Sequence, residues 1–162
     1  MKITQVDLYQ VEIPLIPAIV KYTQKIYDIT ICRVQTDEGL TGIGETAVYH
    51  LTPAGRAALE QKGESYRGKD PLKMDPFAEP GLFECALLDI AGQAYGLPVH
   101  RFFGSKVRDR VPVSYWSVPM EPEDTAAEAE VGARLGFTNH KLKARSWNIV
   151  ERSEERRVGK EC

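Results

Sequence analysis

The stretch from Val111 to Ala144 constrains the fold of this chain more than any other part of it. A strand-like segment, Val111–Val118, is followed by an alanine-rich helical segment, Pro122–Leu135, and then by a second strand-like segment, Thr138–Ala144. A helix between two strands is the connection that allows the strands to run parallel in one sheet. The sequence therefore predicts one βαβ unit, the repeating unit of a parallel sheet or a (β/α) barrel.

Two lysines, Lys141 and Lys143, lie two residues apart in the second of these strands. The alternation of side chains in a strand places both amines on one face and His140 and Leu142 on the other. Two ammonium groups on one face repel each other, which favours the loss of a proton from one of them. A neutral amine can take a proton from a weak carbon acid. An exposed edge strand with two solvated lysines explains the same spacing, so the spacing alone leaves both interpretations open.

The first 48 residues predict an antiparallel meander of three strands. We expect the first strand to end at Pro14, the second to cover Tyr27–Thr36 and the third to cover Leu40–Val48. A glycine-containing turn should join the second strand to the third. The apolar residues change face near Leu8 and Tyr9, which predicts a β-bulge there. This pattern indicates an antiparallel sheet ahead of the βαβ unit.

The middle of the chain is predicted to be helical. Thr52 and Pro53 suit the N-cap and the first position of a helix over Ala54–Lys62. The strongest helical periodicity covers Leu82–Tyr95, and Gly96 supplies the stop signal. Helices beside an antiparallel sheet indicate an α+β domain.

Composition excludes several classes of protein. The chain is 43% hydrophobic and 27% charged with a net charge of −2, so it has no basic surface for nucleic acid. It contains no apolar run of about 18 residues that would cross a membrane. The first residues lack the apolar core of a secretory signal. Three scattered cysteines argue against a disulfide or zinc framework and favour a reducing cytoplasm.

The last eleven residues, 152–162, break every local trend, because they are charged and aperiodic where the next helix should begin. They resemble the in-frame translation of a common sequencing adapter. We interpret residues 152–162 as a non-native read-through tail and expect no part of the fold from them. A genuine solvated tail is the alternative.

Four motifs follow one another along residues 1–151. They are Thr36-Asp37-Glu38-Gly39-Leu40-Thr41-Gly42-Ile43-Gly44-Glu45, Gly68-Lys69-Asp70-Pro71, Ala86–Gln93 with Gly96-Leu97-Pro98, and Gly136-Phe137 leading into Lys141-Leu142-Lys143. In this order they resemble the enolase superfamily, in its mandelate racemase/muconate lactonizing enzyme branch. The resemblance rests on the four motifs together.

The resemblance implies a two-part fold. Residues 1–110 would form an α+β N-terminal capping domain, a three-stranded antiparallel meander plus helices. Residues 111–151 would form the first βαβ unit of an incomplete TIM-type (β/α) barrel. It also implies a Mg²⁺-dependent enzyme that acts on a small-molecule carboxylate substrate. Magnesium would hold the carboxylate and stabilise the enediolate that forms when the α-proton leaves, and the parent protein would be a homo-oligomer.

The resemblance also implies roles for four residues. Lys143 would be the base and Lys141 the neighbour that tunes it. Ser117, at the end of the first barrel strand, matches a position that can touch substrate, although an ordinary strand-end serine fits equally. Tyr22 lies in the loop after Pro14, which in the family closes over substrate, although a solvated loop fits too.

The family's three acidic metal ligands lie on later barrel strands, and its His-Asp pair lies later still. We therefore expect this chain to hold no metal ligand and to be inactive by itself. Three functions remain open for the parent protein. The first is a lyase that dehydrates acid sugars. The second is a racemase or muconate-type cycloisomerase that uses the same enediolate, and the third is a non-catalytic fragment or pseudoenzyme.

Overall fold

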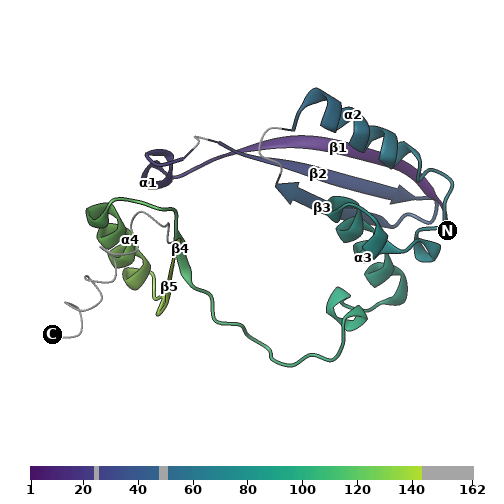
Figure 1. The fold of residues 1–162 in the computed structure, drawn as a ribbon. Coiled ribbons are helices and arrows are strands. Elements are labelled where there is room, and N and C mark those ends of the chain that lie inside the picture. Colours follow the sequence, from purple (N-terminus) through teal and green to yellow (C-terminus); the bar gives the residue numbers. More distant parts are fainter. Residues whose placement is uncertain (24–25, 48–50, 144–162) are drawn as a thin grey trace. The chain divides into compact units, whose positions relative to one another are not determined.

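The computed structural model describes residues 1–23, 26–47 and 51–143 (Figure 1). They form two compact units. The first contains residues 1–14 and 26–109, and the second combines the described residues of the segment 15–25 with those from 110 onward. The predicted strand end at Ala144 and the predicted tail at 152–162 lie outside the described residues. The predicted domain limits of 1–110 and 111–151 stay a prediction.

The first unit is built on the predicted antiparallel meander, which is confirmed. Its strands are β1 (Ile3–Pro14), β2 (Ile26–Thr36) and β3 (Thr41–Ala47), paired in the order β1-β2-β3. The turn between β2 and β3 closes where the Leu40 amide donates to the Thr36 hydroxyl at 3.0 Å. Gly39 in this turn has a φ of +83°, a conformation that side chains other than glycine rarely adopt.

The predicted bulge near Leu8 and Tyr9 is wrong. The register of β1 against β2 runs without interruption from Gln5 to Pro14, and its shift lies between Ile3 and Gln5. Tyr9 and Ile13 are exposed on the outer face of the sheet, where the Arg33 guanidinium lies 5.4 Å from the Tyr9 ring. The exposed apolar residues Tyr9 and Ile13 gave the same sequence pattern that a bulge would give.

Two helices accompany the sheet, α2 (Pro53–Glu64) along β1 and α3 (Gly81–Tyr95) along β3 (Figure 1). The predicted cap of α2 is confirmed, because the Gly55 amide donates to the Thr52 hydroxyl at 3.1 Å. The predicted stop of α3 is confirmed as well, since Gly96 has a φ of +63°. Short 3₁₀ turns are the remaining helical elements described in this unit: η1 (Pro71–Lys73), η2 (Pro76–Ala78) and η3 (Val99–Phe102).

The core of the first unit lies between the sheet and these helices. It consists of nine buried residues: Ile3, Cys32, Val34, Tyr66, Leu82, Phe83, Ala86, Leu87 and Ile90. The glycines of the first sequence motif permit this packing. A Cβ on Gly42 would lie 2.1 Å from the Ala86 carbonyl oxygen, and a Cβ on Gly44 would lie 1.8 Å from that of Leu82. Strand β3 therefore lies directly against the backbone of α3.

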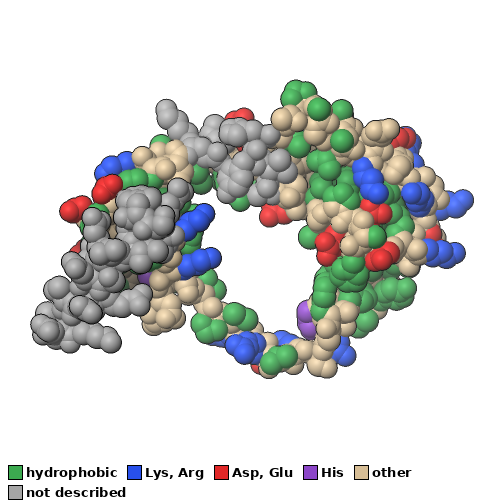
Figure 2. Space-filling view, in the orientation of Figure 1, with side chains coloured by type: hydrophobic (Ala, Val, Ile, Leu, Met, Phe, Trp, Pro, Cys, Tyr) green, Lys and Arg blue, Asp and Glu red, His purple; other side chains and the backbone are tan. Residues whose placement is uncertain are grey.

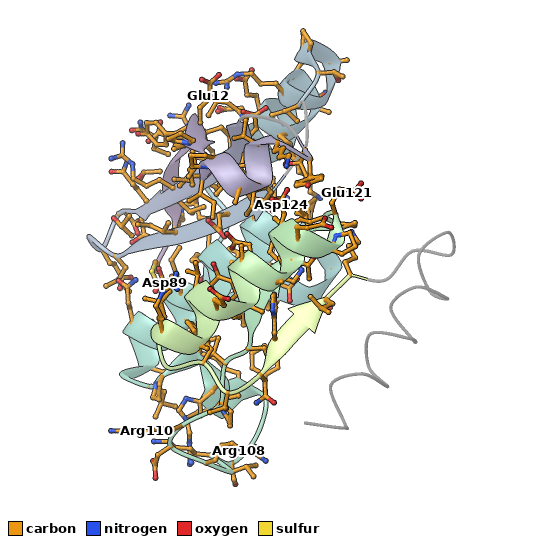
Figure 3. All side chains as sticks on the ribbon, turned by 90° about the vertical axis from the view of Figure 1, so that its left-hand side faces the viewer. Glu12, Asp89, Arg108, Arg110, Glu121 and Asp124 are labelled. Carbon is orange, nitrogen blue, oxygen red and sulfur yellow. The ribbon has the colours of Figure 1, made fainter. Side chains whose placement is uncertain are left out.

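A polar side chain of α3 also holds the contact between α3 and the edge strand β3. Asp89, labelled on α3 in Figure 3, accepts a hydrogen bond of 3.0 Å from the backbone amide of Ile43 in β3. Gln93, one turn later, donates to the Thr41 carbonyl at 2.7 Å and to Asp89 at 3.0 Å. The aspartate of the third motif thus satisfies an edge-strand donor that the meander leaves unpaired.

The second unit contains the predicted βαβ arrangement. Strands β4 (Tyr115–Ser117) and β5 (His140–Leu142) are parallel, and α4 (Pro122–Arg134) connects them. Strand β4 is shorter than the predicted Val111–Val118, since it pairs with β5 over three residues and Val111 and Val113 are exposed. The short helix α1 (Pro17–Val20) belongs to this unit as well.

Charge on the surface is mixed. Figure 2 shows acidic and basic side chains interspersed over the visible face of the first unit, with no large patch of one sign. Among the helices of the described residues, none has the length and apolarity needed to cross a membrane.

Candidate functional site

The two lysines that the sequence singles out lie at the carboxyl end of β5. Lys141 is in the strand, Lys143 follows it directly, and both are exposed. The register sets Lys141 beside Trp116 of β4, so these two side chains share a face of the parallel pair. Strand β5 ends at Leu142, one residue before Lys143, and the common projection of the two amines stays a prediction.

The opposite face of the pair is covered by α4. Tyr115 and His140 are neighbours in the register, and their rings lie 5.3 Å apart. The Tyr115 hydroxyl donates to Glu128 of α4 at 2.7 Å, and a Cβ on Gly132 of α4 would lie 2.9 Å from the Tyr115 ring. Lys141 is therefore on the face turned away from α4. In a (β/α) barrel the helices form the outer ring, so that face is the interior one.

Ser117 is buried, with 1% of its surface exposed. Its Oγ lies 2.6 Å from His140 Nε2, with the donor set by the histidine tautomer. His140 is a partner that sequence reasoning missed, because the register between two parallel strands is not encoded in either strand alone. A contact between Ser117 and substrate stays a prediction, and the observed partner of its hydroxyl is His140.

Tyr22 lies just after α1 and is bonded to α4. Its hydroxyl donates to the Asp124 carboxylate, and Lys21 Nζ lies 2.5 Å from the same oxygen and 5.2 Å from the Tyr22 ring. Hydrogen bonds from Lys21 and then Tyr22 hold the pKa of Asp124 below its ordinary value. Asp124 is an acidic residue in the first turn of α4, and this position carries no information in the sequence on a partner about 100 positions away.

In the described parts of the chain, 1–23, 26–47 and 51–143, no three histidine, cysteine, aspartate or glutamate side chains gather in a way that could hold an ion. Magnesium prefers several oxygen ligands, commonly carboxylates, in near-octahedral geometry. The described residues therefore do not fit a magnesium site.

A hollow of about 310 Å³ lies at the other end of the βαβ unit. Its lining comes from the residues before β4 and before β5, including Val113, Leu135 and Phe137. Barrel enzymes place their chemistry at the carboxyl ends of the strands. The hollow is at the amino ends, so the candidate site is at the opposite end, where Lys143 follows β5.

Among curated proteins, the chain is similar to dehydratases. It is 30% identical to D-galactonate dehydratase of Variovorax paradoxus over 68% of this chain and 33% of that enzyme. It is 29% identical to cis-3-hydroxy-L-proline dehydratase of Roseibium aggregatum over 88% of this chain and 45% of that enzyme. None of the protein-family profiles matches the chain.

Among solved structures, the chain is similar to members of one group of barrel proteins. A mandelate racemase/muconate lactonizing enzyme-type protein from Roseovarius nubinhibens, complexed with magnesium, matches with a TM-score of 0.71 and 32% identity over 90% of this chain. Dipeptide epimerase from Methylococcus capsulatus, complexed with magnesium and a dipeptide, matches with a TM-score of 0.77 and 26% identity over 96% of this chain. The chain covers 44% and 49% of these two structures.

An α+β sheet unit followed by the first βαβ unit of a barrel defines a class of two-part barrel proteins. The chain belongs to the enolase superfamily, in the mandelate racemase/muconate lactonizing enzyme branch. It spans from a third to about half of the length of these relatives and carries a partial barrel.

Proposed function

We propose that the whole protein takes the α-proton from a small carboxylate substrate, with Lys143 as the base, and that the reaction ends in dehydration of an acid sugar. The observation that carries the proposal is the position of Lys141 on the strand face turned away from α4, with Lys143 directly after the carboxyl end of β5. The dehydratase activity of the curated relatives supports the choice of reaction.

In this proposal, Lys143 accepts the α-proton as a neutral amine and becomes an ammonium group. The electron pair of the broken carbon–hydrogen bond moves into the carboxylate and forms an enediolate. The enediolate then expels the β-hydroxyl group, which takes a proton from a general acid of the whole protein and leaves as water, and the enol that remains tautomerises to a 2-keto acid. Lys141, two residues before the base in the sequence, acts beside it.

Magnesium is part of the proposal for the whole protein. Solved relatives are complexed with magnesium, and a divalent cation stabilises negative charge that develops on carboxylate oxygens. The described residues of this chain do not gather metal ligands, so no step above is assigned to the ion.

A second function is favoured by a specific observation. The structural likeness to dipeptide epimerases reaches a TM-score of 0.77, and those relatives are complexed with dipeptides. An epimerase also begins by removing an α-proton, and it then returns a proton to the opposite face. The first step by Lys143 is common to both functions, so this lysine does not discriminate between them.

The test is a substrate screen on the whole protein in the presence of magnesium. The panel contains acid sugars, including D-galactonate, and dipeptides of both configurations. We expect a 2-keto acid product from an acid sugar, and Lys143→Ala should abolish it. Lys73→Ala is the matched control, since 84% of the Lys73 side chain is exposed in the first unit. Epimerised dipeptide without keto acid would favour the second function, and no turnover of either class would contradict both.

A further inference from the structure

One carboxylate in the second unit bonds to two adjacent side chains of a distant segment. Asp124 accepts hydrogen bonds from Lys21 and Tyr22, which precede it by 103 and 102 residues. The segment 15–25 connects β1 to β2 in the sequence, yet its described residues belong to the second compact unit together with α4. A connection of this kind needs bonds that hold it to the second unit, and the Asp124 contact supplies them.

The local structure on both sides presents these groups to one another. After α1, the amides of Tyr22 and Thr23 both donate to the Ile19 carbonyl at 3.0 Å, which forms a tight turn at Lys21 and Tyr22. Asp124 is the third residue of α4 and lies at the start of that helix, next to α1 (Figure 3). A carboxylate in the first turn is also favoured by the helix dipole.

The strength of the contact comes from its two different donors. Lys21 supplies a charge and Tyr22 a hydroxyl, and charge-assisted hydrogen bonds are stronger than neutral ones. The lysine side chain is 61% exposed and the Asp124 side chain 37% exposed, so solvent screens the ionic part. The half-buried tyrosine adds a bond that salt screens less.

The start of α4 is at the functional end of the βαβ unit. Helix α4 begins at Pro122, a few residues after β4 ends at Ser117, so its first turn lies at the carboxyl end of the strands. Lys143 follows the carboxyl end of the parallel strand β5. The Asp124 contact therefore attaches the segment 15–23 at the end of the unit that carries the candidate base.

We propose that Asp124 is a positioning residue that fixes the segment 15–23 beside the candidate site. Lys21 and Tyr22 then anchor the segment through their polar groups, and the segment held in this way is the part that would meet substrate. The proposal rests on the proposed function for what the segment covers. The attachment itself requires neither substrate nor metal, so it can be tested separately.

The first experiment measures trypsin cleavage after Lys21 and hydrogen exchange of the amides of residues 15–23 in the 162-residue chain. Asp124→Ala should accelerate cleavage after Lys21 by about tenfold, since it removes one ion pair and one hydrogen bond. Tyr22→Phe should give a smaller acceleration. Glu123→Gln removes the same charge one residue earlier in α4 and should stay within about twofold of the wild type.

Exchange in α4 and in the β-sheet of the first unit shows whether a variant is folded. Asp124→Asn keeps the shape of the side chain, and it replaces Asp124→Ala in the experiment if the alanine variant loses protection from hydrogen exchange in the whole chain. Wild-type cleavage rates in Asp124→Asn and Tyr22→Phe would overturn the proposal, and so would equal acceleration by Glu123→Gln. In the whole protein, Asp124→Asn should raise KM more than it lowers kcat. An unchanged KM beside faster cleavage would leave the attachment intact and remove its role in substrate binding.

Discussion

Replacing Gly44 with alanine tests the packing of the first unit. The added Cβ would lie 1.8 Å from the Leu82 carbonyl oxygen, 2.8 Å from its carbon and 2.9 Å from the Ala86 nitrogen. All three are backbone atoms of α3, so no side chain can turn away to make room. Strand β3 must therefore move off α3 by more than about 1 Å, which opens the core around Leu82 and Ala86 and strains the edge bond from Ile43 to Asp89.

The cost should be at the upper end of what overpacking causes, about 3 kcal/mol or more. With an unfolding slope of about 2 kcal/mol per molar urea, the midpoint should fall by about 1.5 M. The assay is urea unfolding followed by far-ultraviolet circular dichroism. The loss is large beside a total stability of roughly 5–15 kcal/mol, so partial unfolding in the absence of urea is also consistent.

Gly81→Ala is the matched control. Gly81 begins α3, has no positive φ, and a Cβ there would meet nothing within 4 Å. Alanine is the better helix former by up to about 1 kcal/mol in a helix interior, so this variant should be neutral or slightly more stable. Equal urea midpoints for Gly44→Ala and Gly81→Ala would refute the close approach of β3 to α3.

Two further predictions concern titratable groups. Burial, with a smaller effect from Asp7, raises the pKa of the Cys32 thiol to about 12. An alkylating reagent at pH 8 should therefore label the exposed Cys85 and leave Cys32 unlabelled until urea unfolds the chain. Peptide mass spectrometry measures the labelling of each cysteine. Hydrogen bonds from Lys21 and Tyr22 lower the pKa of the Asp124 carboxyl in the folded chain. The stabilisation that Asp124 provides is therefore complete above its ordinary pKa of 3.8, and it is lost as the pH falls through the lower pKa of the folded state. A carbon NMR titration should place the Asp124 midpoint below 3.8, and Lys21→Met should return it towards 3.8.

The parts of the fold that sequence reasoning predicted are those with local signals. Thr52 caps α2 and Gly96 ends α3 through contacts within a few residues, which a single sequence records directly. Alternation along β2 buries Thr30, Cys32 and Val34, and this period of two is also local. The βαβ unit followed from a helix placed between two strands.

The errors and omissions come from interactions between distant residues. Tyr9 lies on the solvent face beside Arg33 of β2, a contact that the β1 sequence alone does not contain, and the bulge prediction failed there. The bond between Ser117 and His140 depends on the parallel register, and the Asp124 contact joins residues about 100 positions apart. A single sequence carries no record of such pairs. The roles of Lys141, Lys143, Ser117 and Tyr22 towards substrate stay predictions.

The central claim is that Lys143 is the base that removes an α-proton. The most direct measurement is the exchange of that proton for deuterium in D₂O, followed by NMR on an acid sugar or a dipeptide. The whole protein with magnesium should exchange the proton. Lys143→Ala should abolish exchange on one face of the substrate, while Lys73→Ala should not change it.

The 162-residue chain is the accompanying control. Its described residues hold no cluster that could bind the metal, so it should not exchange the proton with or without magnesium. If the whole protein with Lys143→Ala exchanged the proton at the rate of the wild type, Lys143 would not be the base. If the 162-residue chain exchanged the proton with magnesium, metal ligands outside its described residues would not be needed.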